Sequence, residues 1–166
     1  MDTHLVVITD EVVPQSGITL SQCERREILL AEHQVLRRQV EELRRSAGRL
    51  LAGRHDATGD MLRTLATLQS LFPAHLDHEE ALLEPLLEKI DAWGPMRLER
   101  LHEEHRHQRL WLSTLRSALT SGVSLEELAQ RSNSLCDALT IDMAHEEADL
   151  FSVLCDDVIQ IDVGQD

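Results

Sequence analysis

A chain of 166 residues is long enough for one domain with a substantial buried core. Its formal net charge of −14 argues against nucleic acid or an anionic membrane surface as a partner. No apolar run approaches the roughly 20 residues that span a bilayer, so we expect no membrane partner of any kind. Three cysteines without metal-type spacing, and a start without a signal-peptide pattern, indicate a cytoplasmic protein with reduced thiols.

The spacing of apolar residues predicts helices throughout most of the chain. Two Phe, two Trp and no Tyr leave Leu, Val, Ile and Ala to build the core, which favours helices packed on helices. Capping patterns at Ser21 and Ser124 and a capping Asp60 mark helix starts, and Gly53 and Gly122 mark helix ends. The helices are predicted over about 22–52, 60–91, 96–121 and 125–158.

We therefore expect an all-α protein, an antiparallel up-down four-helix bundle over residues 21–159. A short extended N-terminal segment, 1–20, precedes it, and a C-terminal tail, 160–166, follows it. Pro73 and Pro85 lie inside the second helical pattern and predict a bend at one or both.

The most informative stretch is His75 to Pro85, which contains His-x-x-x-Glu within a helical pattern. His75 and Glu79 are one turn apart and share the apolar face of that helix. A related phrase, Asp142 to Phe151, lies in the fourth helix, and both phrases contain His-Glu-Glu-Ala. The first and third helices each contain Glu-His-x-x-x-Arg, so the chain carries a repeat of two helices.

Counting about 100° per residue shows which polar side chains point into the bundle. Each helix contributes at least one to the centre of its apolar face, and such groups are buried only with a metal ion or a dense hydrogen-bond network. The inward set, and our candidate metal ligands, are His33, His75, Glu79, His105, Asp142 and Glu146.

Imidazole and carboxylate donors without cysteine suit iron, manganese or zinc. A carboxylate can bridge two metals about 3.5 to 4 Å apart, and one from each of two helices would do so here. Ranked below the inward set as alternative ligands are His78, His102, His145 and Asp149, whereas His4, His55 and His107 are expected in solvent. Arg37 and Arg109 either pair with Glu79 or Glu146 or extend to solvent.

These residues resemble the hemerythrin-like, or HHE cation-binding, family. The likeness covers about 22–158 and rests on Glu32-His33, His75 to Glu80 with Leu83 and Pro85, Glu104-His105, and His145 to Glu147 with Leu150-Phe151. It implies a four-helix bundle that holds a non-haem di-iron centre with bridging carboxylates and terminal histidines. Members bind dioxygen, sense oxygen or redox state, respond to nitric oxide or donate iron during cluster repair.

Two departures from the family pattern bear on function. The fourth helix has Asp142 where the family has the histidine of His-x-x-x-Glu, and the third lacks the His-x-x-x-His of the oxygen-carrying members. The second departure argues against simple reversible oxygen carriage. The first leaves three alternatives open at one metal position: Asp142 binds as an oxygen donor, His145 swings in instead, or the site holds one metal or none. We expect a cytoplasmic protein with two irons per chain that senses or handles dioxygen, nitric oxide or another small diatomic ligand, redox state or iron; any protein partner is unknown. A carboxylate-rich oxidase- or peroxidase-like enzyme and a metal-free interaction module are the alternatives.

Overall fold

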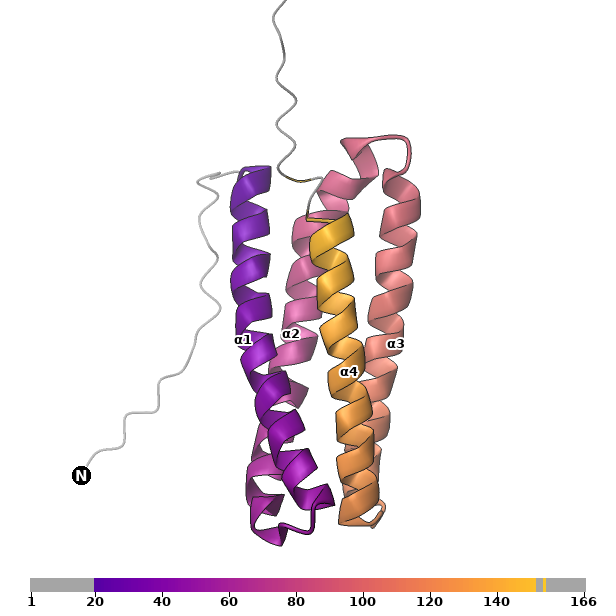
Figure 1. Cartoon of the computed structure of the whole chain (residues 1–166). Helices are drawn as coiled ribbons and strands as arrows, with labels where there is room; N and C mark the ends of the chain where they lie inside the picture. Colours follow the sequence, from indigo (N-terminus) through magenta and orange to yellow (C-terminus); the bar gives the residue numbers. More distant parts are fainter. Residues whose placement is uncertain (1–19, 152–153, 155–166) are drawn as a thin grey trace, which may run out of the picture.

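The computed structural model describes residues 20–151 and residue 154, and this part of the chain forms a four-helix bundle (Figure 1). A single 3-10 turn, η1 (His55–Ala57), lies in the first connection. The long elements are α1 (Gln22–Leu51), α2 (Thr58–Ile90), α3 (Gly94–Thr120) and α4 (Leu125–Asp149). Short connections make successive helices antiparallel, which confirms the predicted fold class.

Local sequence explains most helix ends. Ser21 and Glu24 form the predicted capping box of α1, and the Ser124 hydroxyl accepts from the backbone N–H of Glu127 at the start of α4. Gly53 and Gly122 follow α1 and α3 with φ of 80° and 76°, values that glycine adopts without strain.

Three details of the predicted helices were wrong. Asp60 does not cap α2, because the helix begins two residues earlier, after Ala57, and Asp60 lies in its first turn. Helix α4 ends at Asp149 rather than near 158, since Leu150 and Phe151 are already in a turn. Leu119, which the spacing of apolar residues predicted on the inner face of the third helix, is exposed, and Ala118 takes the inward position on α3. The predicted N-terminal segment, up to residue 19, and the tail 160–166 lie outside the described residues.

Helix α2 runs unbroken through Pro73 and Pro85. None of the helices in the described part of the chain contains a stretch both long enough and apolar enough to span a membrane.

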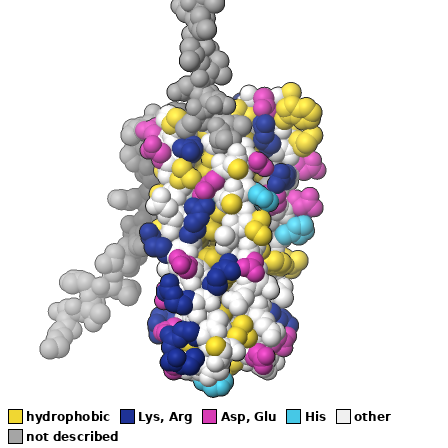
Figure 2. Space-filling model, in the orientation of Figure 1, with side chains coloured by type: hydrophobic (Ala, Val, Ile, Leu, Met, Phe, Trp, Pro, Cys, Tyr) yellow, Lys and Arg dark blue, Asp and Glu magenta, His cyan; other side chains and the backbone are white. Residues whose placement is uncertain are grey.

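Figure 2 shows many arginine and acidic side chains on the bundle surface. Arg44 of α1, for example, pairs with Asp137 of α4. Such exposed pairs contribute at most about 1 kcal/mol each, so the stability of the bundle comes mainly from its interior.

The interior consists of two apolar clusters separated by a polar layer. The larger cluster includes Leu36 to Leu50 of α1 and Met61 to Leu76 of α2, and the smaller includes Leu29, Leu83 and Phe151. Between them, each helix turns at least one charged or imidazole side chain inward. His33, His75, Glu79, His105 and Glu146 occupy this level and are all buried. The apolar clusters on both sides shield the polar layer from water.

Candidate metal centre

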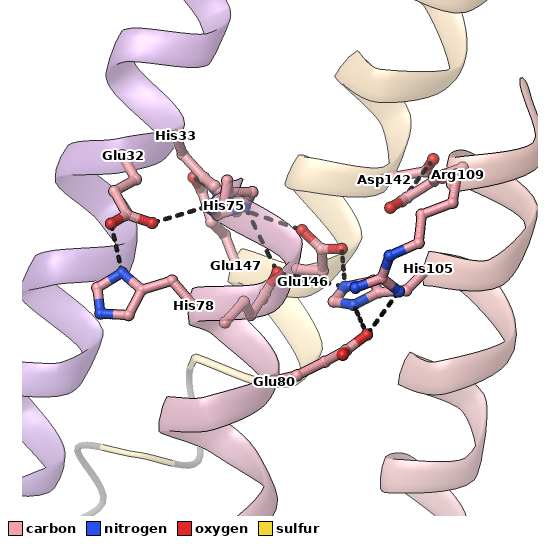
Figure 3. Close-up of polar contacts among 12 residues, drawn as sticks. Glu32, His33, His75, His78, Glu80, His105, Arg109, Asp142, Glu146 and Glu147 are labelled. Carbon is pink, nitrogen blue, oxygen red and sulfur yellow. Dashed lines mark hydrogen bonds and ion pairs between the residues drawn. The ribbon is translucent and has the colours of Figure 1, made fainter. Parts of the chain in front are cut away.

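Five of the six predicted ligands meet in the polar layer (Figure 3). They form two groups that share Glu79, and within each group the potential ligand atoms lie within 4.8 Å of one another. One group is His33, His75 and Glu79, and the other is Glu79, His105 and Glu146. All five residues are buried, and each of the four helices supplies at least one of them.

The Nε2 atoms of the three histidines point toward the centre of the cluster. His33 Nε2 lies 3.2 Å from His75 Nε2 and 3.4 Å from Glu146 Oε2. His105 Nε2 lies 3.4 Å from Glu79 Oε2, which is 3.5 Å from His75 Nε2. Two nitrogens bound to one ion at the usual distance of about 2.1 Å are themselves about 3 Å apart when the angle at the ion is near 90°. The spacing therefore suits ions held between these atoms.

The opposite edge of each imidazole contacts a carboxylate from another helix. His75 Nδ1 is 2.8 Å from Glu32, His33 Nδ1 is 2.9 Å from Glu147, and His105 Nδ1 is 2.7 Å from Glu80. An ionised carboxylate only accepts hydrogen bonds, so Nδ1 donates and a neutral ring keeps its lone pair on Nε2. This is the orientation that histidine ligands of metals adopt.

Arginines support two of these carboxylates. Arg37 lies 2.7 Å from Glu147, and Arg109 lies 2.8 Å from Glu80. Burial raises the pKa of both glutamates, but hydrogen bonds from the arginine and the histidine outweigh it and leave each pKa below the ordinary value of 4.5. Both glutamates therefore stay ionised at neutral pH. The arginines contact these neighbours of Glu146 and Glu79 rather than Glu146 and Glu79 themselves.

The centre of the cluster is rich in lone pairs and poor in donors. Neither carboxylate oxygen of Glu79 nor Nε2 of His105 has a hydrogen-bond partner among the described residues, although both residues are fully buried. The lone pairs on Nε2 of His33 and His75 face each other, which requires a positive charge between them, from a proton or a metal ion. Buried polar groups without partners are costly, so this donor set fits a bound cation.

Burial acts on the titratable groups in the same sense. It lowers the pKa of His33, which favours the neutral imidazole that metals bind. Burial, with the nearby charge of Glu79 adding to it, raises the pKa of Glu146 well above its ordinary value. Two carboxylates crowded into one buried site repel each other, and a cation between them would relieve this repulsion.

Asp142, the sixth predicted ligand, lies beside the cluster but belongs to neither group. Its side chain is half-buried and accepts a hydrogen bond of 3.2 Å from Gln108 Nε2. Burial raises its pKa, and the charge of nearby Glu104 adds to that effect. Asp142 is one helical turn from Glu146 and lies on the side of the cluster where His105 is (Figure 3).

The lower-ranked candidates lie farther out. His78 contacts Glu32 at 2.6 Å, His102 contacts Glu84 at 2.6 Å, and Asp149 pairs with Arg100 at 3.6 Å. His145, like Asp149, is exposed, and none of the four belongs to either group. His55 and His107 are exposed as predicted, and His4 lies outside the described residues.

Sequence reasoning missed Glu32, Glu80 and Glu147, the three carboxylates that hold the histidines. Each is adjacent in the chain to a residue of the cluster: Glu32 to His33, Glu80 to Glu79, and Glu147 to Glu146. The doubled Glu-Glu in α2 and α4 and the Glu-His of α1 were therefore a usable signal, since one residue faces the centre and its neighbour faces the adjacent helix.

Comparison with known proteins agrees with this arrangement. Neither the curated proteins nor the solved structures include a significant match to the chain. The family model described as the hemerythrin HHE cation binding domain matches residues 25–154, which include all four helices almost completely and every residue of the cluster. The chain therefore belongs to the hemerythrin family of HHE cation-binding domains.

Proposed function

We propose that the chain holds two non-haem iron ions in this cluster and uses them to sense or handle dioxygen, nitric oxide, redox state or iron. The observation that carries the proposal is the buried carboxylate of Glu79, which belongs to both ligand groups and has no hydrogen-bond partner in the part of the chain that the structure describes. A carboxylate shared in this way is the usual bridge of a two-metal site. His33 and His75 would bind one ion and His105 the other, with Glu79 and Glu146 between them.

Iron in such a centre supplies a redox change and reversible binding of a small diatomic molecule. The protein supplies the rest. Glu32, Glu80 and Glu147 hold the proton on Nδ1 of the three histidines and fix the orientation of the rings. Phe151 packs against His33 with ring centroids 5.2 Å apart, and it is fully buried. These contacts keep the donor atoms in place.

The first test is metal content. Protein expressed with ample iron and purified in air should contain about two irons per chain and show a near-ultraviolet charge-transfer band. In a separate sample, nitric oxide added to the reduced protein should change its absorption spectrum. His105→Ala should lose at least one iron, whereas His102→Ala on the same helix should retain both, because His102 pairs with Glu84 and belongs to neither ligand group. Iron-free protein from iron-rich cells would contradict the proposal.

A turnover enzyme is the second candidate. Its supporting observation is a cavity of about 340 Å³ between α3 and α4, which reaches Glu146 and is large enough for a small substrate. Consumption of peroxide that is lost in Glu79→Ala would favour this reading. Iron-loaded protein that turns over neither peroxide nor nitric oxide would remove it and leave the sensor or carrier.

A further inference from the structure

The two halves of the cluster are related by the internal repeat, and most contacts obey that relation. When α1 is equated with α3 and α2 with α4, His33 corresponds to His105 and Glu79 to Glu146. The contact of His33 with Glu147, at 2.9 Å, then corresponds to that of His105 with Glu80, at 2.7 Å. The arginine contacts to those two glutamates correspond as well, at 2.7 and 2.8 Å.

The correspondence fails at one place. His75 has Asp142 as its counterpart, so the 2.8 Å contact between His75 and Glu32 is not repeated. Glu104, the counterpart of Glu32, is instead bonded to Arg100 at 2.8 Å.

Two of the residues that differ contact each other, and a third binds Glu104. Arg100 stands where α1 has Ile28, and Gln108 stands where α1 has Leu36. Gln108 donates to Asp142, and Arg100 occupies Glu104. The changes at positions 100, 108 and 142 thus lie together in the α3–α4 half, as an altered ligand environment rather than one isolated substitution.

We infer that the two metal positions differ in affinity: the α1–α2 half, with His33 and His75, binds its ion first, and the α3–α4 half binds a second ion more weakly. The inference rests on the proposed function. The α1–α2 half presents two imidazole nitrogens already 3.2 Å apart, whereas the α3–α4 half presents one imidazole, that of His105, together with the carboxylate of Glu146. Asp142 completes the second half as an oxygen donor, and Gln108 is its positioning residue.

A cavity adjoins each of the two metal positions. The cavity of about 340 Å³ between α3 and α4 is lined by Glu104, His145 and the Glu146 side chain itself. A cavity of about 360 Å³ between α1 and α2 reaches His75, but its lining includes Glu32, which already accepts from the Nδ1 edge of that ring. The second ion therefore exchanges with solvent through the α3–α4 cavity.

Equilibrium dialysis of the full chain against Fe(II) without oxygen tests the inference. The wild type should bind two ions in two steps whose dissociation constants differ at least tenfold. Two variants copy the α1–α2 half: Asp142→His, and Asp142→His combined with Arg100→Ile, which frees Glu104. Each should lower the dissociation constant of the second step about tenfold or more and leave that of the first step unchanged. Gln108→Leu should weaken the second step by about tenfold, the usual effect of removing a group that orients a ligand.

Release of iron to a chelator gives an independent reading on the unmodified protein, with one ion lost at least ten times faster than the other. The control is Glu103→Gln, which removes an exposed carboxylate from the same helix and should change neither step. The asymmetry would be overturned if the two ions bound with equal affinity and left at equal rates. It would also be overturned if none of the three variants changed the dissociation constant of the second step. Either result would leave the proposed function intact. Absence of any bound ion would overturn both.

Discussion

Replacing Glu79 by glutamine should change the stability of the protein in opposite directions without and with metal. The variant should be more stable than the wild type when both are metal-free, and less stable when both are loaded with metal. The Glu79 side chain is fully buried, and within residues 20–151 and 154 neither of its oxygens has a hydrogen-bond partner. An uncompensated buried charge costs several kcal/mol, part of which protons on neighbouring groups can offset. Glutamine keeps the shape and removes the charge, so metal-free Glu79→Gln should be about 2 kcal/mol more stable than the wild type.

The metal-loaded proteins should show the opposite order. At a free metal concentration of about 1,000 times the dissociation constant, binding stabilises the wild type by about 4 kcal/mol. A neutral amide is a poor bridge between two cations, so the variant should lose most of that gain. For a chain of this size each kcal/mol shifts Tm by about 2–4 °C, so both differences are measurable.

Thermal unfolding in chelator and in excess Fe(II) without oxygen provides the assay. Glu79→Gln should melt about 4–8 °C above the wild type in chelator and below it with iron. Glu103→Gln, an exposed position on α3, should match the wild type in both solutions. A lower Tm for Glu79→Gln in chelator would show that the carboxylate is well compensated without metal, and the reasoning from its missing partners would fail.

Three further outcomes are expected. Because the pKa of Glu147 is lowered, the contribution of its ionised carboxylate to stability is present above about pH 4.5 and lost as the pH falls. Arg37→Met removes one cause of the lowered pKa and should raise the pH midpoint of acid unfolding, measured by circular dichroism. An unchanged midpoint would contradict the role of the Arg37–Glu147 pair. Leu68→Ala, in the larger apolar cluster, should cost about 3 kcal/mol with or without metal, and a cost seen only in one state would be inconsistent with a purely packing role. Gly94→Ala should destabilise the protein, because the added Cβ would lie 1.7 Å from the carbonyl oxygen of Leu87. Gly48→Ala adds a Cβ that meets nothing within 4 Å, so it should stabilise α1 by up to about 1 kcal/mol. Urea unfolding measures both changes, and equal effects would refute the steric argument.

Periodicity predicted the direction of the inward side chains because a helix fixes the angle between successive residues. That is why His33, His75, Glu79, His105 and Glu146 were correctly expected at the centre of the bundle. The angle says nothing about reach. Asp142 lies on the same side as Glu146, yet its oxygens belong to neither ligand group, and Gln108 donates a hydrogen bond to one of them beside the cluster.

The carboxylates around the histidines could not be assigned from the pattern alone. Glu32, Glu80 and Glu147 are each about 100° away from an inward residue, so they face a neighbouring helix. Which helix that is depends on how the bundle is assembled: Glu32 of α1 meets His75 of α2, whereas Glu147 of α4 meets His33 of α1. The end of α4 was missed for a similar reason, since apolar residues continue past Asp149 with near-helical spacing while the backbone turns there.

The central claim is that one buried cluster in this bundle holds two metal ions, and anomalous diffraction tests it most directly. Crystals of protein loaded with iron, measured at the iron absorption edge, should show two peaks in the polar layer. One should contact Nε2 of His33 and His75, the other Nε2 of His105, with Glu79 between them. Peaks confined to the surface pairs of His78 or His102, or no peak in the bundle, would contradict the claim.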